Sequence, residues 1–343
     1  MRRLLNTLFI LSEDLYLSLE NENLVAWREK NVVQRIPLLN VENIFYFGYK
    51  GASPALLGAC AKRQIGFCFL TPYGKFLARV CGASHGNVLL RKAQYRMAEQ
   101  ESDILQLAKW FLTGKIWNSR LLLMRFLRDH PLSVDKEQFT DAIASLKRSL
   151  HDLQNAKNGD EIRGVEGNAA HLYFSLFDQL ILREKKTFYL HSRNKRPPLD
   201  AMNALLSFLY TLLASDCANA LETVGLDSYV GFLHRDRPGR ESLALDLMEE
   251  FRSLLADRLA LFLVNNQSLT GKHFKKTETG AVLLNEAGRK IVLTKWQERK
   301  QEIVEHPFLK EKMPWGLAPY VQALLLAKWI RGDLDGYPAF MGK

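Results

Sequence analysis

The spacing of apolar residues changes once along this chain of 343 residues, near Gly86, and that change limits the folds open to it. Before it, apolar residues alternate, as over residues 15–19, which is the period of a strand with one buried face. After it, they recur near the 3.6-residue period of helices. We therefore predict an α+β protein, with a small, mainly antiparallel β domain over residues 1–86 and a larger all-α domain over residues 87–343.

β-rich runs and turn signals predict the elements of the first part. The turn residues 71–74 lie between two such runs and indicate a hairpin. Ser53 can cap a helix and Pro54 suits a first helical position, so one short helix is expected there. The runs predicted as strands are the first 11 residues and the segments 15–19, 43–47, 66–70 and 75–81.

Long segments with helical periodicity fill the second part. We expect the segment 87–128 to be interrupted at Thr113-Gly114, because glycine commonly ends a helix. The other predicted helices cover residues 135–155, 169–182, 199–221, 242–264 and 319–331.

Charge and cysteine content narrow the class of protein. Lys and Arg outnumber Asp and Glu by 47 to 37, a net charge of +10, which is typical of proteins that bind polyanions but also serves solubility. The cysteines form no C-x-x-C pair, so neither a zinc knuckle nor a disulfide framework is expected. No stretch reaches the roughly 18 uninterrupted apolar residues of a membrane span. We expect a cytoplasmic protein with no membrane partner.

Two single residues carry groups suited to metal-assisted phosphodiester chemistry, in which Mg²⁺ prefers oxygen ligands and Mn²⁺ also admits an imidazole. Glu166 stands between Gly164 and Gly167, which leave room for a substrate backbone. Its alternative role is a favourable charge at the amino end of the helix predicted from residue 169. His234 ends a largely apolar stretch, a position also typical of a hydrogen-bonded core histidine.

The predicted helix 242–264 contributes further acids. At about 100° per residue, Asp246 and Glu249 share a polar stripe, whereas Glu250 lies nearer the edge of the apolar face. A solvated helix face is the alternative, but such faces more usually mix acids with Lys or Arg at these spacings. The mutual repulsion of the two acids therefore indicates a bound cation.

Basic side chains lie near these acids in the sequence. Cations bring phosphate backbones into a site whose acids would otherwise repel them, although each cluster also has the composition of an ordinary solvated loop. The residues that we predict to bind DNA are Arg183, Lys185, Lys186, Arg193, Lys195, Arg196, Arg235, Arg237, Arg240, Lys272, Lys275 and Lys276.

Three motifs together resemble the family of CRISPR-associated protein 1, the endonuclease and integrase of CRISPR spacer acquisition. They are RGVEGNAAHLYF from Arg163, SRNKRPPLDAMNALLSFLY from Ser192 and GLDSYVGFLHRDRPGRESLALDLMEEFR from Gly225. Two further segments, FGYKGASPALLGACAKR from Phe47 and RGDLDGYP from Arg331, are similar to the subtype I-C branch. The resemblance spans nearly the whole chain.

The resemblance implies a catalytic site that holds Mg²⁺ or Mn²⁺. Its ligands would be Glu166, His234 and an acid of the following helix, where the helix pattern favours Glu249, with Asp246 as a nearby auxiliary acid. The implied reaction is transesterification, in which the 3′-hydroxyl of a prespacer DNA strand attacks a phosphodiester at the edge of a CRISPR repeat. With water as the nucleophile the same site is an endonuclease. The absence of a nucleophilic Ser or Cys motif agrees with such chemistry.

The resemblance also implies partners. It predicts a homodimer joined through the β domain, and a heterohexamer in which two such dimers flank a dimer of the small, ferredoxin-fold second CRISPR-associated protein. From the residues alone, two other functions stay open. One is a non-catalytic DNA-binding scaffold, and the other is a non-haem iron oxygenase that uses His171, His234 and a carboxylate.

Overall fold

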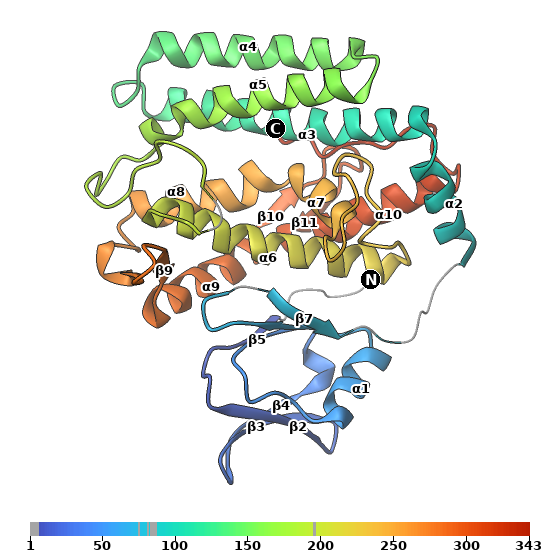
Figure 1. Cartoon of the computed structure of the whole chain (residues 1–343), viewed down its shortest axis with the longest axis vertical. Coiled ribbons are helices and arrows are strands. Elements are labelled where there is room, and N and C mark those ends of the chain that lie inside the picture. The colour runs from blue at the N-terminus through green and yellow to red at the C-terminus, as the bar shows by residue number, and fades with distance from the viewer. Residues whose placement is uncertain (1–6, 75, 81, 83–87, 195–196) are drawn as a thin grey trace.

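The computed structural model describes residues 7–74, 76–80, 82, 88–194 and 197–343. A β-rich region precedes a larger helical region and lies at one end of the molecule (Figure 1), so the predicted α+β class is confirmed. The strands of the β-rich region are β1 (Thr7–Ile10), β2 (Leu15–Glu20), β3 (Asn23–Arg28), β4 (Asn31–Pro37), β5 (Asn43–Phe47), β6 (Gly66–Leu70) and β7 (Phe76–Val80).

These strands form two sheets. β2, β3 and β4 make an antiparallel meander, and the other four strands follow the order β1-β5-β6-β7. In the second sheet β5 is parallel to both β1 and β6, whereas β6 and β7 are antiparallel. The parallel pairing of β5 with β6 is made possible by a crossover helix, α1 (Pro54–Lys62). As predicted, Ser53 caps α1, and its hydroxyl accepts from Leu56 N at 3.2 Å. The ends of the predicted strands at residues 1–6, 75 and 81 lie outside the described residues.

The helical region is built on nine α-helices in the described part of the chain. They are α2 (Val88–Ala98), α3 (Glu101–Asp129), α4 (Lys136–Asn155), α5 (Gly159–Phe177), α6 (Ala201–Val224), α7 (Ser242–Glu249), α8 (Arg258–Asn265), α9 (Glu286–Gln301) and α10 (Ala318–Ile330). Two short antiparallel hairpins add strands to the region predicted as all-α. Their strands are β8 (Phe274–Lys276) with β9 (Val282–Leu284), and β10 (Ile303–Glu305) with β11 (Lys312–Pro314). Short 3₁₀ turns cover Leu38–Asn40, Asp178–Leu180, Gly271–His273 and Trp315–Leu317.

The helix break predicted at Thr113-Gly114 is wrong. The chain breaks between α2 and α3, near residue 100, and Gly114 lies in the middle of α3. A Cβ at Gly114 would lie 2.9 Å from Glu250 Cγ. The glycine is therefore present because α3 packs closely against the segment after α7, and not because the helix ends there.

Two other predicted helices differ from the structure by more than a few residues. α5 begins at Gly159, ten residues before the predicted start, because the Asn158 side chain accepts hydrogen bonds from the N–H groups of Asp160 and Glu161. The predicted helix 242–264 is interrupted by a π-helical turn over Arg252–Asp257. Such turns are frequent at functional sites.

The central helix of the helical region is α6, with α3, α4 and α5 packed together at the end away from the β-rich region (Figure 1). Among the described residues, α6 alone has the length and hydropathy of a membrane span, and 72% of its most apolar window is buried in the molecule. Phe45 and Phe47 of β5 belong to the same apolar core as α6. The two regions thus share a core, and the boundary at residue 86 stays a prediction.

Candidate metal and DNA site

Three helices each place one charged side chain at a common point. Lys115 lies on α3, Glu166 on α5 and Glu249 at the end of α7. The Lys115 ammonium donates to Glu166 Oε1 and lies 3.2 Å from Glu249 Oε2. The two acids predicted as ligands are therefore neighbours in space, and a lysine that the sequence analysis did not single out stands between them.

His234 approaches Glu249 from the loop between α6 and α7. Asp246 fixes this loop, because its buried carboxylate accepts from the backbone N–H groups of Phe232, Leu233 and His234 at 2.7, 3.0 and 2.9 Å. The same carboxylate lies 2.7 Å from His234 Nδ1. When the proton of the neutral ring is on Nδ1, Nε2 has a free lone pair that can bind a metal ion. Nε2 lies 3.9 Å from Glu249 Oε1. Asp246 thus orients the imidazole, as an auxiliary acid would.

Glu249 is 2% exposed and is surrounded by positive charge. Arg252 Nη2 lies 2.8 Å from its Oε1, and Lys115 lies beside its Oε2. Burial acts to raise the pKa of Glu249, but the charges of Arg252 and Lys115 outweigh burial and lower the pKa to about 2. The carboxylate is therefore ionised at neutral pH, as a metal ligand must be.

In its chemistry the donor set fits a hard divalent cation, since two carboxylates lie beside one ammonium and one imidazole lies 3.9 Å from the second oxygen of Glu249. Glu249 Oε2 is buried and accepts no well-directed hydrogen bond from the described residues, although the Lys115 ammonium is near. A buried carboxylate oxygen that accepts no well-directed hydrogen bond can bind a cation. Within the described part of the chain, no three His, Cys, Asp or Glu side chains are arranged as metal ligands, and Lys115 occupies the space between the two acids.

Glu250, the neighbour of Glu249, is engaged elsewhere. Its carboxylate accepts from Tyr337 Oη at 2.6 Å, from Gln322 Nε2 at 2.7 Å and from Phe340 N at 2.8 Å. Burial raises the pKa of Glu250 to about 7, although these hydrogen bonds lower it in part. Both carboxylate oxygens of Glu250 thus already accept hydrogen bonds, and its rank as the poorer ligand candidate stays a prediction.

A buried network holds Arg252 in place. The guanidinium groups of Arg252 and Arg193 lie 4.8 and 5.1 Å from the centroid of the Tyr210 ring. The hydroxyls of Tyr210 and Tyr173 donate to Asp257 at 2.6 and 2.8 Å. Burial raises the pKa of Asp257 to about 6, against the opposing effects of the two hydroxyl donors and the arginines. Arg252 was not predicted as part of the site, although it follows Glu249 by three residues, a spacing at which helical side chains meet.

The predicted DNA-binding residues differ in their surroundings. Lys185 pairs with Asp178 at 3.3 Å. Arg193 turns inward and donates to Asn203 Oδ1, so it also holds its own loop in place. Arg240 is partly buried. The exposed members are Arg183, Lys185, Lys186, Arg235, Arg237, Lys272, Lys275 and Lys276. Lys195 and Arg196 lie outside the described residues.

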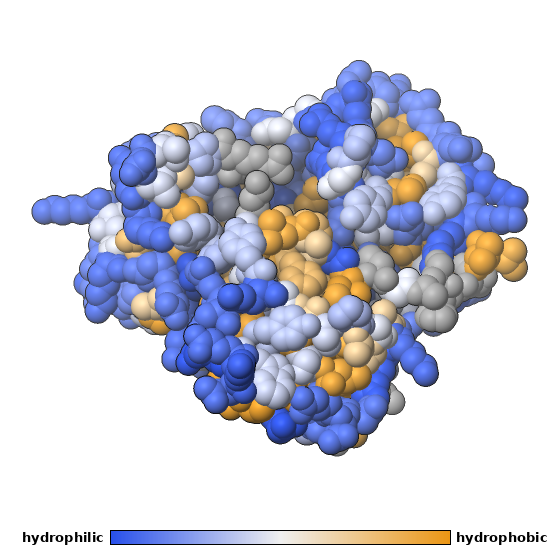
Figure 2. Space-filling model, turned by 60° about the horizontal axis from the view of Figure 1, so that its bottom comes forward, coloured by the Kyte–Doolittle hydropathy of each residue, from blue (hydrophilic) through white to orange (hydrophobic). Residues whose placement is uncertain are grey.

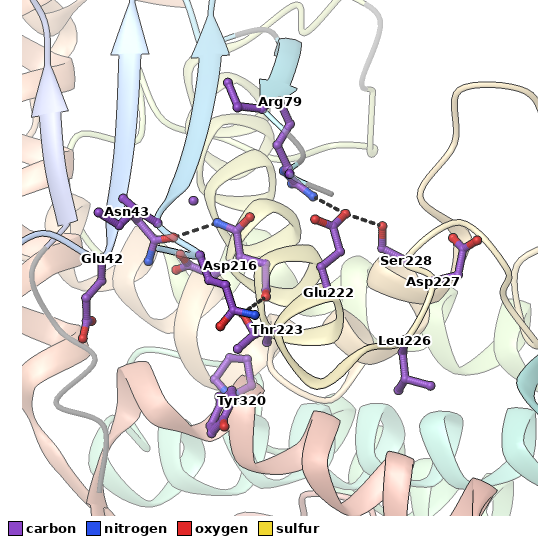
Figure 3. Close-up of a pocket in the computed structure, with 18 of the residues that line it drawn as sticks. Glu42, Asn43, Arg79, Asp216, Glu222, Thr223, Leu226, Asp227, Ser228 and Tyr320 are labelled. Atoms are coloured by element: carbon purple, nitrogen blue, oxygen red, sulfur yellow. Dashed lines mark hydrogen bonds and ion pairs between the residues drawn. The ribbon is translucent and has the colours of Figure 1, made fainter. Parts of the chain in front are cut away.

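A cavity of about 510 Å³ lies between the β-rich region and α6, and none of Glu166, His234 and Glu249 lines it. Figure 3 shows Arg79 of β7 linked through Glu222 of α6 to Ser228. Arg79 Nη1 lies 3.3 Å from Glu222 Oε1, to which Ser228 donates at 3.1 Å. The Ser228 carbonyl in turn accepts from backbone N–H groups at the start of α7. This wall therefore joins β7 to one of the helices that form the candidate site.

A family model described as CRISPR associated protein Cas1 matches residues 8–298. The chain belongs to the Cas1 family. It is 48% identical over 341 residues to "CRISPR-associated endonuclease Cas1 1" of Chlorobaculum tepidum, with 99% of each chain covered.

Two solved structures with the same fold are more distant in sequence. A casposase bound to an integration product matches with a TM-score of 0.84 at 22% identity, covering 98% of this chain and 94% of the other. A Cas6-RT-Cas1–Cas2 complex matches with a TM-score of 0.83 at 21% identity, covering 99% of this chain and 36% of the other. Membership of the Cas1 family confirms the resemblance at the level of the family.

Proposed function

We propose that this Cas1 family member is a divalent-metal-dependent DNA endonuclease and integrase, which inserts prespacer DNA into a CRISPR array. The observation that carries the proposal is the position of Glu249 between the other two predicted ligands: its Oε2 meets Glu166 at the Lys115 ammonium, and its Oε1 lies 3.9 Å from His234 Nε2. Relatives named as CRISPR-associated endonucleases support DNA cleavage, and the casposase bound to an integration product supports strand joining.

The residues of the site have distinct tasks in the proposed reaction. Mg²⁺ or Mn²⁺ held by Glu166, His234 and Glu249 would polarise the target phosphate, ease deprotonation of the attacking 3′-hydroxyl and stabilise charge in the transition state. Asp246 keeps His234 Nε2 directed toward the site. Water in place of the 3′-hydroxyl makes the reaction a cleavage. No nucleophilic side chain is needed, because phosphoryl transfer depends on positioning and charge.

The surface of α5 beside Glu166 is open to substrate. A Cβ built on Gly164 or on Gly167 would meet no atom within 4 Å. A DNA backbone can therefore approach the carboxylate more closely than side chains at these positions would allow. This openness supports the role that the sequence analysis gave to the two glycines.

The exposed basic residues are proposed to bind DNA through phosphate. Arg235 and Arg237 directly follow His234 and are both exposed, so their charges border the site. Lys272, Lys275 and Lys276 lie on and before β8, also exposed. The same role is proposed for Arg183, Lys185, Lys186, Arg193, Lys195, Arg196 and Arg240.

The proposed assembly is a homodimer joined through the β-rich region. Figure 2 looks toward the end of the molecule that carries this region and shows apolar side chains gathered near its middle within a hydrophilic rim. On the β2-β3-β4 sheet, Tyr16, Val32 and Val33 are each at least 40% exposed. Exposed apolar patches are typical of protein interfaces. Light scattering that gave a monomer mass at micromolar concentration would contradict the homodimer.

The further partner proposed is the small second CRISPR-associated protein, as a dimer flanked by two dimers of this chain. The Cas1–Cas2 complex among the fold neighbours supports that partner. Assignment to subtype I-C and to the cytoplasm is part of the same proposal. Failure of the chain to associate with its cognate small partner would contradict the heterohexamer.

A gel assay separates this function from a non-catalytic DNA-binding scaffold. Branched and linear DNA are incubated with the protein in Mn²⁺, Mg²⁺ or EDTA. The expected result is metal-dependent nicking and strand transfer that Glu166→Ala, His234→Ala and Glu249→Ala each abolish while the protein stays folded. His171→Ala is the matched control, because His171 is exposed on α5, and it should keep full activity. DNA binding without metal-dependent nicking would support the scaffold instead.

A further inference from the structure

Lys115 stands where the two carboxylates of the candidate site converge. Its ammonium donates to Glu166 Oε1 and lies 3.2 Å from Glu249 Oε2, so one positive charge bridges acids on α5 and α7. The Lys115 side chain is 13% exposed, which places the bridge inside the protein. A cation within reach of both acids relieves their repulsion in the way a bound metal ion would.

We propose that Lys115 is a tethered placeholder cation: it holds Glu166 and Glu249 in position when no divalent ion is bound, and it must withdraw before the ion can take both. The inference rests on the proposed metal site. It assigns to a residue of α3 a positioning role that sets the metal affinity of the site.

The two cations beside Glu249 differ in their freedom to leave. Arg252 follows Glu249 by one helical turn, and its guanidinium lies over the Tyr210 ring at 4.8 Å from the centroid. Lys115 instead carries its charge at the end of a flexible four-carbon chain. Its contact with Glu249 Oε2 is an ion pair without a well-directed hydrogen bond. Lys115 is therefore the cation that moves away when metal binds, and its movement frees Oε2 of Glu249.

The position of Lys115 on α3 is itself fixed by packing. The preceding residue, Gly114, allows Glu250 to approach, since a Cβ there would lie 2.9 Å from Glu250 Cγ. Two residues further on, Trp117 donates to the carbonyl of Gly342 at 2.9 Å. The backbone of Lys115 thus stays in place, and its side chain alone has to move when metal binds.

The test measures metal binding by the full-length protein, freed of metal with EDTA and then titrated with Mn²⁺ while free Mn²⁺ is followed by electron paramagnetic resonance. Lys115→Met removes the charge and keeps the length. It should bind Mn²⁺ about tenfold more tightly than the wild type, or tighter still, because no like charge has to be displaced. Lys115→Arg should bind no more tightly than the wild type. Lys109→Met is the control on the same helix, where the Lys109 ammonium donates to the carbonyl of Gln154 on α4, and it should leave the affinity unchanged.

The unfolding temperature is a second measurement, and its response to Mn²⁺ distinguishes a placeholder cation from an ion pair with a structural role alone. In EDTA, Lys115→Met should unfold at a lower temperature than the wild type, since two acids then lack their shared cation. Saturating Mn²⁺ should close that difference. If Lys115→Met does not fold without metal, Lys115→Gln, which retains an amide donor without the charge, serves in its place.

The outcomes separate this inference from the function on which it rests. Wild-type protein that binds Mn²⁺, with equal or weaker binding by the Met and Gln variants, would overturn the placeholder role and leave the metal site standing. Absence of Mn²⁺ binding in all variants, including the wild type, would overturn both.

Discussion

Glu249 and Glu250 are adjacent in sequence, yet among the described residues their carboxylates share no hydrogen-bond or ion-pair partner. Glu249 contacts Lys115 and Arg252, whereas Glu250 accepts from Tyr337 and other groups of the carboxyl-terminal part of the chain. Their pKa values differ accordingly, about 2 for Glu249 and about 7 for Glu250. One acid is held ionised by cations, and the other is a buried hydrogen-bond acceptor that joins α7 to the end of the chain.

Substitutions at Glu249 should therefore affect activity far more than substitutions at Glu250. Glu249→Ala should eliminate metal-dependent cleavage, and Glu249→Asp should keep part of it and favour Mn²⁺, which tolerates altered ligand geometry better than octahedral Mg²⁺. Glu250→Gln should keep most of the activity and lose about 1–2 kcal/mol of stability, because one acceptor becomes a donor. Cleavage rates in both metals, with urea unfolding alongside, check this. An inactive Glu250→Gln with an active Glu249→Ala would move the ligand assignment to Glu250.

Asp246→Asn tests whether this acid acts through His234. The amide offers one acceptor oxygen in place of two, so the hydrogen bonds from the 232–234 backbone and from the His234 ring cannot all be kept. We expect activity to fall about 10–100-fold, as for partners that orient a metal ligand. The variant should still bind Mn²⁺, though more weakly, and titration of metal against activity measures this. Activity equal to that of the wild type would show that Asp246 does not position the imidazole.

The elements that the sequence predicted well have signals contained within a few residues. Ser53 and Pro54 located the start of α1, and the predicted helix 135–155 agrees with α4 to within one residue. The start of α5 was missed because Gly164 and Gly167 resemble a helix break. Each glycine costs a helix about 1 kcal/mol, which the Asn158 cap offsets only in part, and the packing of α5 against α3 and α4 stabilises the rest.

Other features depended on contacts that no local pattern encodes. β4 was missed because five of its first six residues are exposed, which removes the alternation that marks a strand. Asp246 and Glu249 were placed on a polar stripe but are buried, Asp246 under the 232–234 loop and Glu249 beside Lys115 of α3. Lys115 had no signal at all, because a lysine on a long helix is typically a surface residue. The motifs thus located the acids, and only the fold located the cation between them.

Substitution of the glycines that flank Glu166 should raise stability and lower cleavage activity. Gly164→Ala and Gly167→Ala meet no neighbouring atom and lie within α5, so each should stabilise the protein by about 0.5–1 kcal/mol. The added methyl groups stand where the DNA backbone is proposed to approach, and cleavage should decrease. Urea unfolding and cleavage assays on the same preparations check both effects. Unchanged cleavage would mean that DNA does not approach this face of α5.

Gly114→Ala is the contrasting case on α3. A gain in helix propensity of about 1 kcal/mol is opposed by a contact of 2.9 Å with Glu250 Cγ, and overpacking of that kind costs about 1–3 kcal/mol. Because hydrogen bonds hold the Glu250 side chain, it cannot move aside freely. We expect a net loss of stability in urea unfolding. A more stable variant would show that α3 can shift away from Glu250.

The buried carboxyl of Asp257 should make stability depend on pH. Its pKa is raised by burial from the usual 3.8 to about 6, so the folded state binds a proton more tightly than the unfolded state. The stabilising contribution is complete below pH 3.8 and is lost as pH rises through 6, by about 3 kcal/mol at most. Asp257→Asn should flatten this part of the profile between pH 4 and 7. Parallel profiles for the two proteins in urea unfolding would rule out a raised pKa at Asp257.

Arg235 and Arg237 are proposed to contact phosphate and not bases, which gives a specific expectation for salt dependence. Each phosphate contact to duplex DNA contributes a slope of about 0.9 in the logarithm of affinity against the logarithm of salt concentration. Arg235→Ala and Arg237→Ala should each weaken binding to unrelated sequences alike and reduce the slope by about that amount. Lys30→Ala is the matched control, because Lys30 is exposed in the turn between β3 and β4 of the β-rich region. Fluorescence anisotropy over a salt series measures both quantities. A loss of affinity for one sequence only, or an equal change in slope for Lys30→Ala, would contradict a phosphate contact beside His234.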